Sequence, residues 1–263
     1  MGFNDETPTI ISTNEPHMAC LFLLDTSESM SRGNAINSLN EGINRFKEDI
    51  CKDKRTKDIL DVAIVEFNTS VRIVQNWCPV EYMEPVNLVA NGGTDMESGL
   101  RQAIDMVRER SHFYYEFTGT VPYKPWIVMI TDGYPNSTID GIAAEIADLD
   151  EKGKLHLWSL AVEGANTSML NKLCGGKRAL ILKGTDFSDF FDWMTKSMRS
   201  VSQSSPGEKP KGVGLPGNVD KNIDDSTHGQ QVSFEYFLEN KSDYVFVVDR
   251  GAVTGKGEAA QTL

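Results

Sequence analysis

The sequence is poor in cysteine, which limits the kinds of protein it can encode. Its 263 residues include only four cysteines, and no two of them have the Cys-x-x-Cys spacing of redox or zinc sites. Small domains that rely on disulfides carry many more cysteines, so we expect reduced thiols and no disulfide framework. The four histidines form no spaced cluster, which argues against a zinc site.

The sequence also lacks an excess of basic residues. It has 26 lysines and arginines against 38 acidic residues, a net charge of −12, which argues against binding to nucleic acid or to anionic lipid. No apolar run approaches the roughly 20 residues that a membrane-spanning helix needs. Residues 1–6 have neither the basic nor the apolar region of a signal peptide. We therefore expect a cytoplasmic protein.

An unbroken apolar run near the start is the most informative segment that is present. Residues 18–24 read Met-Ala-Cys-Leu-Phe-Leu-Leu, which is typical of a strand buried on both faces of a parallel sheet. The run leads directly into Asp25, Ser27 and Ser29. Carboxylate and hydroxyl oxygens in a loop suit a hard divalent cation, and open α/β sheets place their ligands at the carboxyl ends of strands.

Two later loops complete the pattern. Residues 91–95 form a glycine-hinged loop that presents the hydroxyl of Thr94 just before a helical pattern. Residues 126–131 are a second buried strand, and Asp132 follows it. If the sheet places the three loops side by side, two carboxylates and three hydroxyls converge as candidate metal ligands. These residues are Asp25, Ser27, Ser29, Thr94 and Asp132.

The three motifs together resemble a known family. Asp-x-Ser-x-Ser after the first strand, a distant Gly-Gly-Thr and a strand ending in Thr-Asp-Gly are similar to the von Willebrand factor A (VWA) domain, whose metal-ion-dependent adhesion site (MIDAS) is built from three such loops. The resemblance covers roughly residues 16–200. The sequence is most similar to small stand-alone bacterial VWA proteins, including the tellurium-resistance type.

The resemblance implies a role for each candidate ligand. Ser27, Ser29 and Thr94 would coordinate the cation directly, whereas Asp25 and Asp132 would act directly or through water. With Mg²⁺, or alternatively Mn²⁺ or Ca²⁺, a coordination position stays open for an Asp or Glu carboxylate of a partner protein. The resemblance also implies a context in a bacterial stress-response or defence complex.

A purely structural interpretation of the same residues is also open. Ser27 and Ser29 could cap the first helix, and Asp132 could open a turn before Gly133. Asp95 directly follows Thr94; we favour a helix cap over a role at the metal.

Strand and helix patterns alternate along the chain, which predicts an α/β fold with a doubly wound, mostly parallel sheet. The turn at residues 68–70 is too short for a parallel crossover, so the next strand is expected to be an antiparallel edge. Residues 113–117 are aromatic and are expected to cap the domain or to form an exposed contact loop. Strands are expected at 18–24, 60–67, 71–77, 126–131, 155–162 and 179–182, and helices at 33–51, 96–111, 142–152, 165–173 and 186–200.

Composition divides the chain further. Serine, glycine, proline and charge dominate after residue 201, and strand periodicity returns later, which predicts a C-terminal β-hairpin extension. We favour a hairpin that packs back on the domain over one that docks on another chain by strand addition. The expected divisions are an N-terminal arm (1–15), a VWA domain (16–200), a flexible linker (201–230), a hairpin (231–250) and a disordered tail (251–263).

The sequence thus favours a metal-dependent protein-interaction module rather than an enzyme. One alternative is a Mg²⁺-dependent phosphohydrolase with Asp25 as the phosphoryl acceptor. Such enzymes have a second carboxylate two residues later as the acid/base, whereas this chain has Ser27 at that position. The other alternative is an interaction protein that acts through the hairpin.

Overall fold

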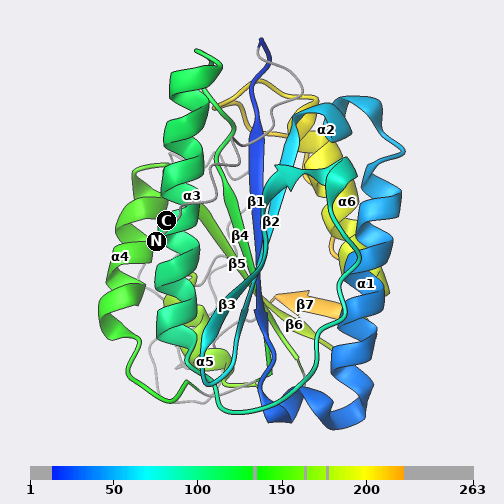
Figure 1. Cartoon of the computed structure of the whole chain (residues 1–263), viewed down its shortest axis with the longest axis vertical. Helices are drawn as coiled ribbons and strands as arrows, with labels where there is room; N and C mark the ends of the chain where they lie inside the picture. Colours follow the sequence, from blue (N-terminus) through cyan, green and yellow to red (C-terminus); the bar gives the residue numbers. More distant parts are fainter. Residues whose placement is uncertain (1–13, 133–134, 163–164, 176–177, 222–263) are drawn as a thin grey trace, which may run out of the picture. The chain divides into compact units, whose positions relative to one another are not determined.

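A seven-stranded mixed sheet organises the computed structural model, which describes residues 14–132, 135–162, 165–175 and 178–221. The strand order is β3-β2-β1-β4-β5-β6-β7, and only β3 and β7, at the two edges, run antiparallel to their neighbours (Figure 1). The strands are β1 (Met18–Asp25), β2 (Leu60–Phe67), β3 (Val71–Pro79), β4 (Trp126–Thr131), β5 (His156–Ala161), β6 (Ala179–Leu182) and β7 (Val219–Lys221).

Helices cover both faces of the sheet (Figure 1). One core forms where α1 and α6 pack on the sheet, and a second forms under α3, α4 and α5. The helices are α1 (Ala35–Ile50), α2 (Lys54–Ile59), α3 (Met96–Phe117), α4 (Asp140–Glu151), α5 (Thr167–Leu173) and α6 (Ser188–Ser202). None of the helices within the described ranges is long and apolar enough to cross a membrane.

Strand β1 lies in the middle of the sheet, between β2 and β4. All eight of its residues are buried, as the unbroken apolar run predicted. Alternate side chains point to opposite faces, so Phe22 contributes to the core under α1 while Leu23 contributes to the core under α3. The predicted doubly wound, mostly parallel sheet is confirmed, but it has two antiparallel edge strands rather than one.

Two helix predictions need correction near the start of the chain. The first helix was expected over 33–51, but a 3-10 segment (Glu28–Asn34) precedes α1, because Gly33 and Asn34 adopt left-handed φ angles of 57° and 67° that break the helix. No helix was expected between residues 51 and 60, but α2 begins at Lys54. The Asp53 carboxylate caps α2 by accepting a hydrogen bond from the Thr56 amide at 2.8 Å.

Helix α3 is longer than predicted. The aromatic residues 113–117, expected to form a cap or a loop, continue the helix to Phe117. Tyr114 is buried in this last part, whereas Phe117 is exposed. The burial of Tyr114 holds the extra turns of α3 against the sheet.

The linker predicted over 201–230 also differs over its described part. Trp193 Nε1 donates a hydrogen bond to the carbonyl of Val213 at 3.2 Å, and β7 pairs with β6. The chain up to Lys221 therefore packs on the domain. The predicted hairpin, the predicted tail and residues 1–13 of the predicted arm lie outside the described residues.

A buried ionic cluster ties α3 to the amino-terminal end of β2. Arg110 Nη2 donates a hydrogen bond to Asp61 Oδ2 at 2.8 Å, the Tyr114 hydroxyl donates to the same oxygen, and His17 Nδ1 lies 3.5 Å from it. Burial alone would raise the pKa of Asp61. The hydrogen bond from His17, the charge of Arg110 and the remaining hydrogen bonds outweigh burial and hold this pKa below its usual value.

We predict that Asp61→Asn lowers the free energy of unfolding by about 3–5 kcal/mol, because it leaves the Arg110 guanidinium buried without a counter-charge. Urea denaturation of the two proteins measures this difference. Glu97→Gln is the matched control, since Glu97 pairs with Arg101 at an exposed site and should cost less than about 1 kcal/mol. Equal losses in the two variants would show that the buried cluster contributes no more than a surface ion pair.

Candidate metal centre

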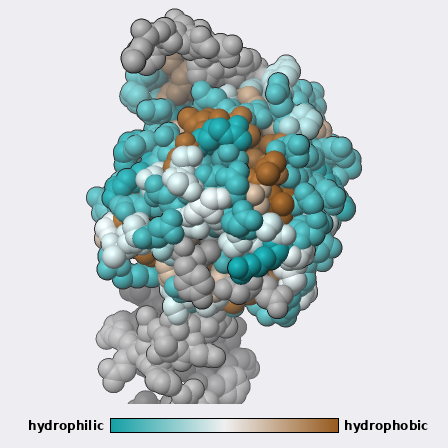
Figure 2. Space-filling model, turned by 60° about the horizontal axis from the view of Figure 1, so that its bottom comes forward, coloured by the Kyte–Doolittle hydropathy of each residue, from teal (hydrophilic) through white to brown (hydrophobic). Residues whose placement is uncertain are grey.

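Two of the predicted loops are held together by backbone hydrogen bonds at the carboxyl end of the sheet, which is turned toward the viewer in Figure 2. The Asn91 amide donates to the Thr26 carbonyl at 2.8 Å, and the Glu28 amide donates to the Gly92 carbonyl at 3.0 Å. These bonds fix the loop after β1 against the loop before α3. The predicted proximity of the loops therefore follows from a defined backbone register.

Four of the five predicted ligands form one hydrogen-bonded chain. The Ser27 amide donates to Asp25 Oδ1 at 2.8 Å, and the Ser27 and Ser29 hydroxyl oxygens lie 3.0 Å apart. The Ser29 hydroxyl donates to Asp132 Oδ1 at 2.7 Å, across 103 residues of sequence. Ser27 makes no side-chain capping bond to the helix that follows it, so the alternative role as a helix cap is not observed for it.

The fifth predicted ligand, Thr94, lies in the adjoining loop. Its carbonyl accepts a hydrogen bond from the Asn136 amide at 3.1 Å, which joins this loop to the loop after β4. Thr94 is buried, and its hydroxyl makes no hydrogen bond to the other four within the described part of the chain. The neighbouring Asp95 carboxylate accepts from the Ser98 amide at 3.2 Å, which confirms Asp95 as the cap of α3.

The Asp25 carboxylate is fully buried at the end of β1. Its Oδ2 accepts a hydrogen bond from the Thr131 hydroxyl at 2.6 Å, opposite the bond from Ser27 to Oδ1. Burial raises the pKa of Asp25, the hydrogen bonds from Ser27 and Thr131 oppose this, and the charge of Asp132 adds to the rise. The Asp25 pKa therefore lies above its usual value, chiefly because the carboxyl group is buried.

The donor set fits a hard divalent cation. No described lysine or arginine forms an ion pair with Asp25 or Asp132, so their negative charges lack a protein counter-charge. Two carboxylates and neighbouring hydroxyl oxygens are the ligand types that Mg²⁺ takes. Among the described residues, no group of three or more His, Cys, Asp or Glu could hold a metal, so a cation at these loops would draw on hydroxyl, carbonyl or water oxygens as well.

Several supporting residues were not singled out from the sequence. Asn68 Nδ2 lies 3.2 Å from both Thr26 Oγ1 and Asn91 Oδ1, and Thr69 Oγ1 accepts from the Gly93 amide at 2.8 Å. The turn after β2 therefore braces the two neighbouring loops. The sequence contains one signal for the role of this turn: it directly follows β2, a buried parallel strand, just as the Asp25 loop follows β1.

A comparison with protein families places the predicted ligands in a known domain. Residues 20–135, which include all five of them, match the family model described as von Willebrand factor type A domain. The predicted resemblance to the VWA domain is therefore confirmed for this part of the chain. Such domains commonly mediate protein–protein interaction or adhesion and are typically not enzymes.

Two curated proteins are similar to this chain. Calcium-activated chloride channel regulator 1 of Homo sapiens is 27% identical over 232 residues, which cover 82% of this chain and 23% of that protein. The petrobactin-binding protein YclQ of Bacillus subtilis is 54% identical over 45 residues, 17% of this chain and 14% of that protein. The chain therefore spans less than a quarter of either relative's length.

Solved structures show the same fold at low sequence identity. The pilus adhesin SpaC of Lactobacillus rhamnosus GG superposes with a TM-score of 0.59 at 12% identity, over 74% of this chain and 31% of that chain. The vWF domain of the pili tip protein Mfa5 of Porphyromonas gingivalis gives a TM-score of 0.52 at 9% identity, over 73% of this chain and 98% of that chain. The conserved hypothetical protein BatB of Bacteroides thetaiotaomicron gives a TM-score of 0.50 at 15% identity, over 71% of this chain and 100% of that chain.

We predict that Gly92→Ala destabilises the protein more than Gly184→Ala. Both glycines have left-handed φ angles, 71° and 79°, so either alanine should cost about 1–2 kcal/mol in backbone strain. Only at Gly92 would the added Cβ also lie 2.5 Å from Thr69 Oγ1, whereas nothing lies within 4 Å at Gly184. Thermal unfolding of the two variants measures the difference, and equal midpoints would contradict close packing of the Gly92 loop on Thr69.

Proposed function

We propose that this chain is a metal-dependent protein-interaction module. A divalent cation, Mg²⁺ in the first instance, is held by the five predicted ligands, and a partner protein completes its coordination with an Asp or Glu carboxylate. The observation that carries this proposal is the hydrogen-bonded chain from Asp25 through Ser27 and Ser29 to Asp132. It gathers two negative charges without a protein cation to balance them.

The protonation of the site is compatible with metal binding. A serine hydroxyl that donates its proton still has lone pairs, so Ser29 can donate to Asp132 and present its oxygen to a cation at the same time. Only two of the five side chains carry charge. A divalent cation there would keep enough positive charge to attract a further carboxylate, which is what a docking role requires.

The surroundings favour binding over turnover. Both oxygens of Asp25 already accept hydrogen bonds, from the Ser27 amide and from the Thr131 hydroxyl, which lowers their nucleophilicity toward phosphorus. Each oxygen keeps a further lone pair that can contact a cation. The end of the molecule in Figure 2 shows a hydrophobic patch among hydrophilic residues, a mixture that suits a protein partner. We further propose that the module acts in the cytoplasm, in a bacterial stress-response or defence complex, on the basis of the resemblance to small bacterial VWA proteins.

Isothermal titration of the purified chain with MgCl₂, MnCl₂ and CaCl₂ tests the metal site. We predict one site per chain, and a loss of affinity of roughly tenfold or more when Ser27→Ala and Ser29→Ala are combined. Ser31→Ala is the control, because the Ser31 hydroxyl lies in the same segment but donates to the Glu28 carbonyl. Circular dichroism of each variant separates lost ligands from lost folding, and absence of heat with all three ions would overturn the proposal.

Partner binding tests the docking role separately. The chain and its Asp25→Ala variant are used as baits in extracts of the native host, with Mg²⁺ or with EDTA. A partner that is retained only by the unaltered chain in Mg²⁺, and that loses binding when one of its own Asp or Glu residues is replaced by Asn or Gln, supports the proposal. A partner retained equally in EDTA would show that docking does not require the metal.

A further inference from the structure

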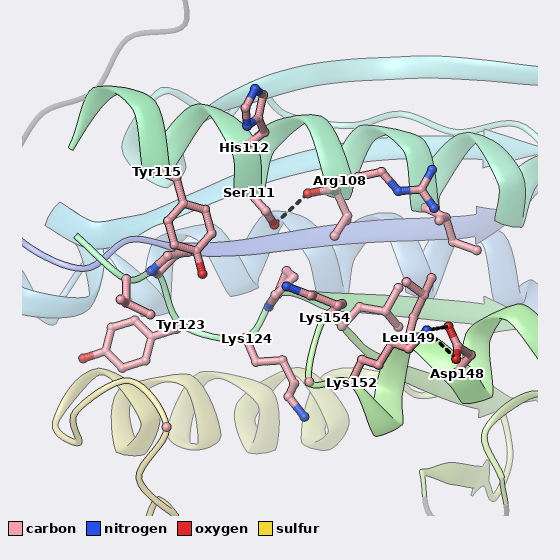
Figure 3. Close-up of a pocket in the computed structure, with 18 residues that line it drawn as sticks. Arg108, Ser111, His112, Tyr115, Tyr123, Lys124, Asp148, Leu149, Lys152 and Lys154 are labelled. Atoms are coloured by element: carbon pink, nitrogen blue, oxygen red, sulfur yellow. Dashed lines mark hydrogen bonds and ion pairs between the residues drawn. The ribbon is translucent and has the colours of Figure 1, made fainter. Parts of the chain in front are cut away.

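A groove lies at the opposite end of the sheet from the metal loops. Its walls are the second half of α3, the segment 121–125 before β4, and the turn 152–155 between α4 and β5 (Figure 3). The cavity measures about 700 Å³, which is within the range of sites that hold small ligands or a few side chains of a peptide. Since β4 has six residues, the length of this strand separates the groove from Asp132.

The charge of the groove is opposite to that of the whole chain. Its lining includes four cationic side chains and one carboxylate, although acidic residues outnumber basic ones 38 to 26 in the chain. The Lys152 ammonium pairs with Asp148 at 2.8 Å, and the Arg108 guanidinium pairs with Asp105 at 3.0 Å and with Glu145 at 3.3 Å. Lys154, by contrast, is exposed and makes no ion pair with any residue of the described ranges. The cationic side chains are Arg108, Lys124, Lys152 and Lys154.

Apolar side chains are exposed at the same place. Tyr115 and Val121, which both line the groove, are 52% and 62% exposed. In Figure 3 the Tyr115 ring points from α3 toward the segment that holds Tyr123 and Lys124. Exposed apolar side chains that gather beside a hollow mark a site of interaction.

We propose that this groove binds an acidic segment of a partner protein, in which Asp or Glu residues flank aromatic or aliphatic ones. The lysines would form ion pairs with the carboxylates of the segment. The ring of Tyr115 and the side chain of Val121 would contact its apolar groups. This site uses none of the predicted metal ligands, so it stands apart from the proposed metal-dependent docking.

A peptide fits these observations better than an anionic membrane does. The apolar residues border a hollow, which encloses a chain segment, whereas a lipid surface is best met by a protruding face. Glu116 and Glu151 are exposed close to the groove in sequence, and the net charge of −12 would repel an anionic bilayer. A short segment entering the groove meets the lysines without bringing these acidic residues against a charged plane.

Selection from a displayed library of random peptides tests the proposal. The full chain is immobilised in EDTA, so that a peptide cannot be retained through a bound metal. We predict enrichment of peptides that combine Asp or Glu with Phe, Tyr, Trp or Leu. The binding of a labelled selected peptide, measured by fluorescence anisotropy, should weaken at least about tenfold in Lys154→Glu and also in Val121→Ser.

Lys54→Glu is the matched control, because it reverses the same charge at an exposed position at the start of α2, and its peptide affinity should not change. The proposal is overturned if no peptide is enriched, if the enriched peptides lack acidic residues, or if Lys154→Glu and Val121→Ser bind as the unaltered chain does. It is also overturned if lysine-dependent binding appears only with phosphatidylserine–phosphatidylcholine vesicles in a sedimentation assay, which would identify a membrane site instead.

Discussion

The burial of the Asp25 carboxylate is the constraint on which the loop end of this domain depends. A buried carboxylate is costly unless each oxygen finds a partner or a metal, and the fold provides a partner for each: the Ser27 amide and the Thr131 hydroxyl. The hydrogen bond from the Ser27 amide turns the chain directly after β1. The hydrogen bond from the Thr131 hydroxyl links the end of β1 to the end of β4. With both strand ends held in this way, Asp132 arrives within reach of the Ser29 hydroxyl. The geometry of the candidate centre is thus a consequence of satisfying one buried group.

Helix α3 connects this end of the molecule to the other. It begins at the Asp95 cap beside the metal loops, and its 22 residues extend over about 33 Å. Its far half carries Arg110, which is paired with Asp61, and the exposed Tyr115 of the groove. Because the ionic cluster with Asp61 anchors the far half, the groove rests on a helix whose position is fixed at both ends. The two proposed binding sites therefore share one rigid element, although they share no residue.

The sequence predicted the parts of the fold whose signals are local. The apolar runs that became β1 and β4 were readable because both faces of each strand are buried, and the polar residues that follow them gave the candidate site. The packing of residues 203–221 could not be predicted, because a segment rich in serine, glycine and proline has the composition of a linker. Its position depends on a tertiary contact, the hydrogen bond from Trp193 to the Val213 carbonyl. The last turns of α3 were missed for a related reason, because the burial of Tyr114 depends on Asp61, which is 53 residues away.

The acidic character of the chain explains why its two proposed sites are built differently. A protein with a net charge of −12 repels carboxylates, so it can bind an acidic partner only where a local positive charge overcomes the general field. At the metal loops the charge would come from a cation, because the side chains there are carboxylates and hydroxyls. At the groove it comes from the protein itself, through lysines such as Lys154. A chelator would remove the first charge and leave the second, whereas salt would screen the exposed lysines more strongly than a cation held by its ligands. The two sites would therefore respond to different solution conditions even when their partners present the same chemical group.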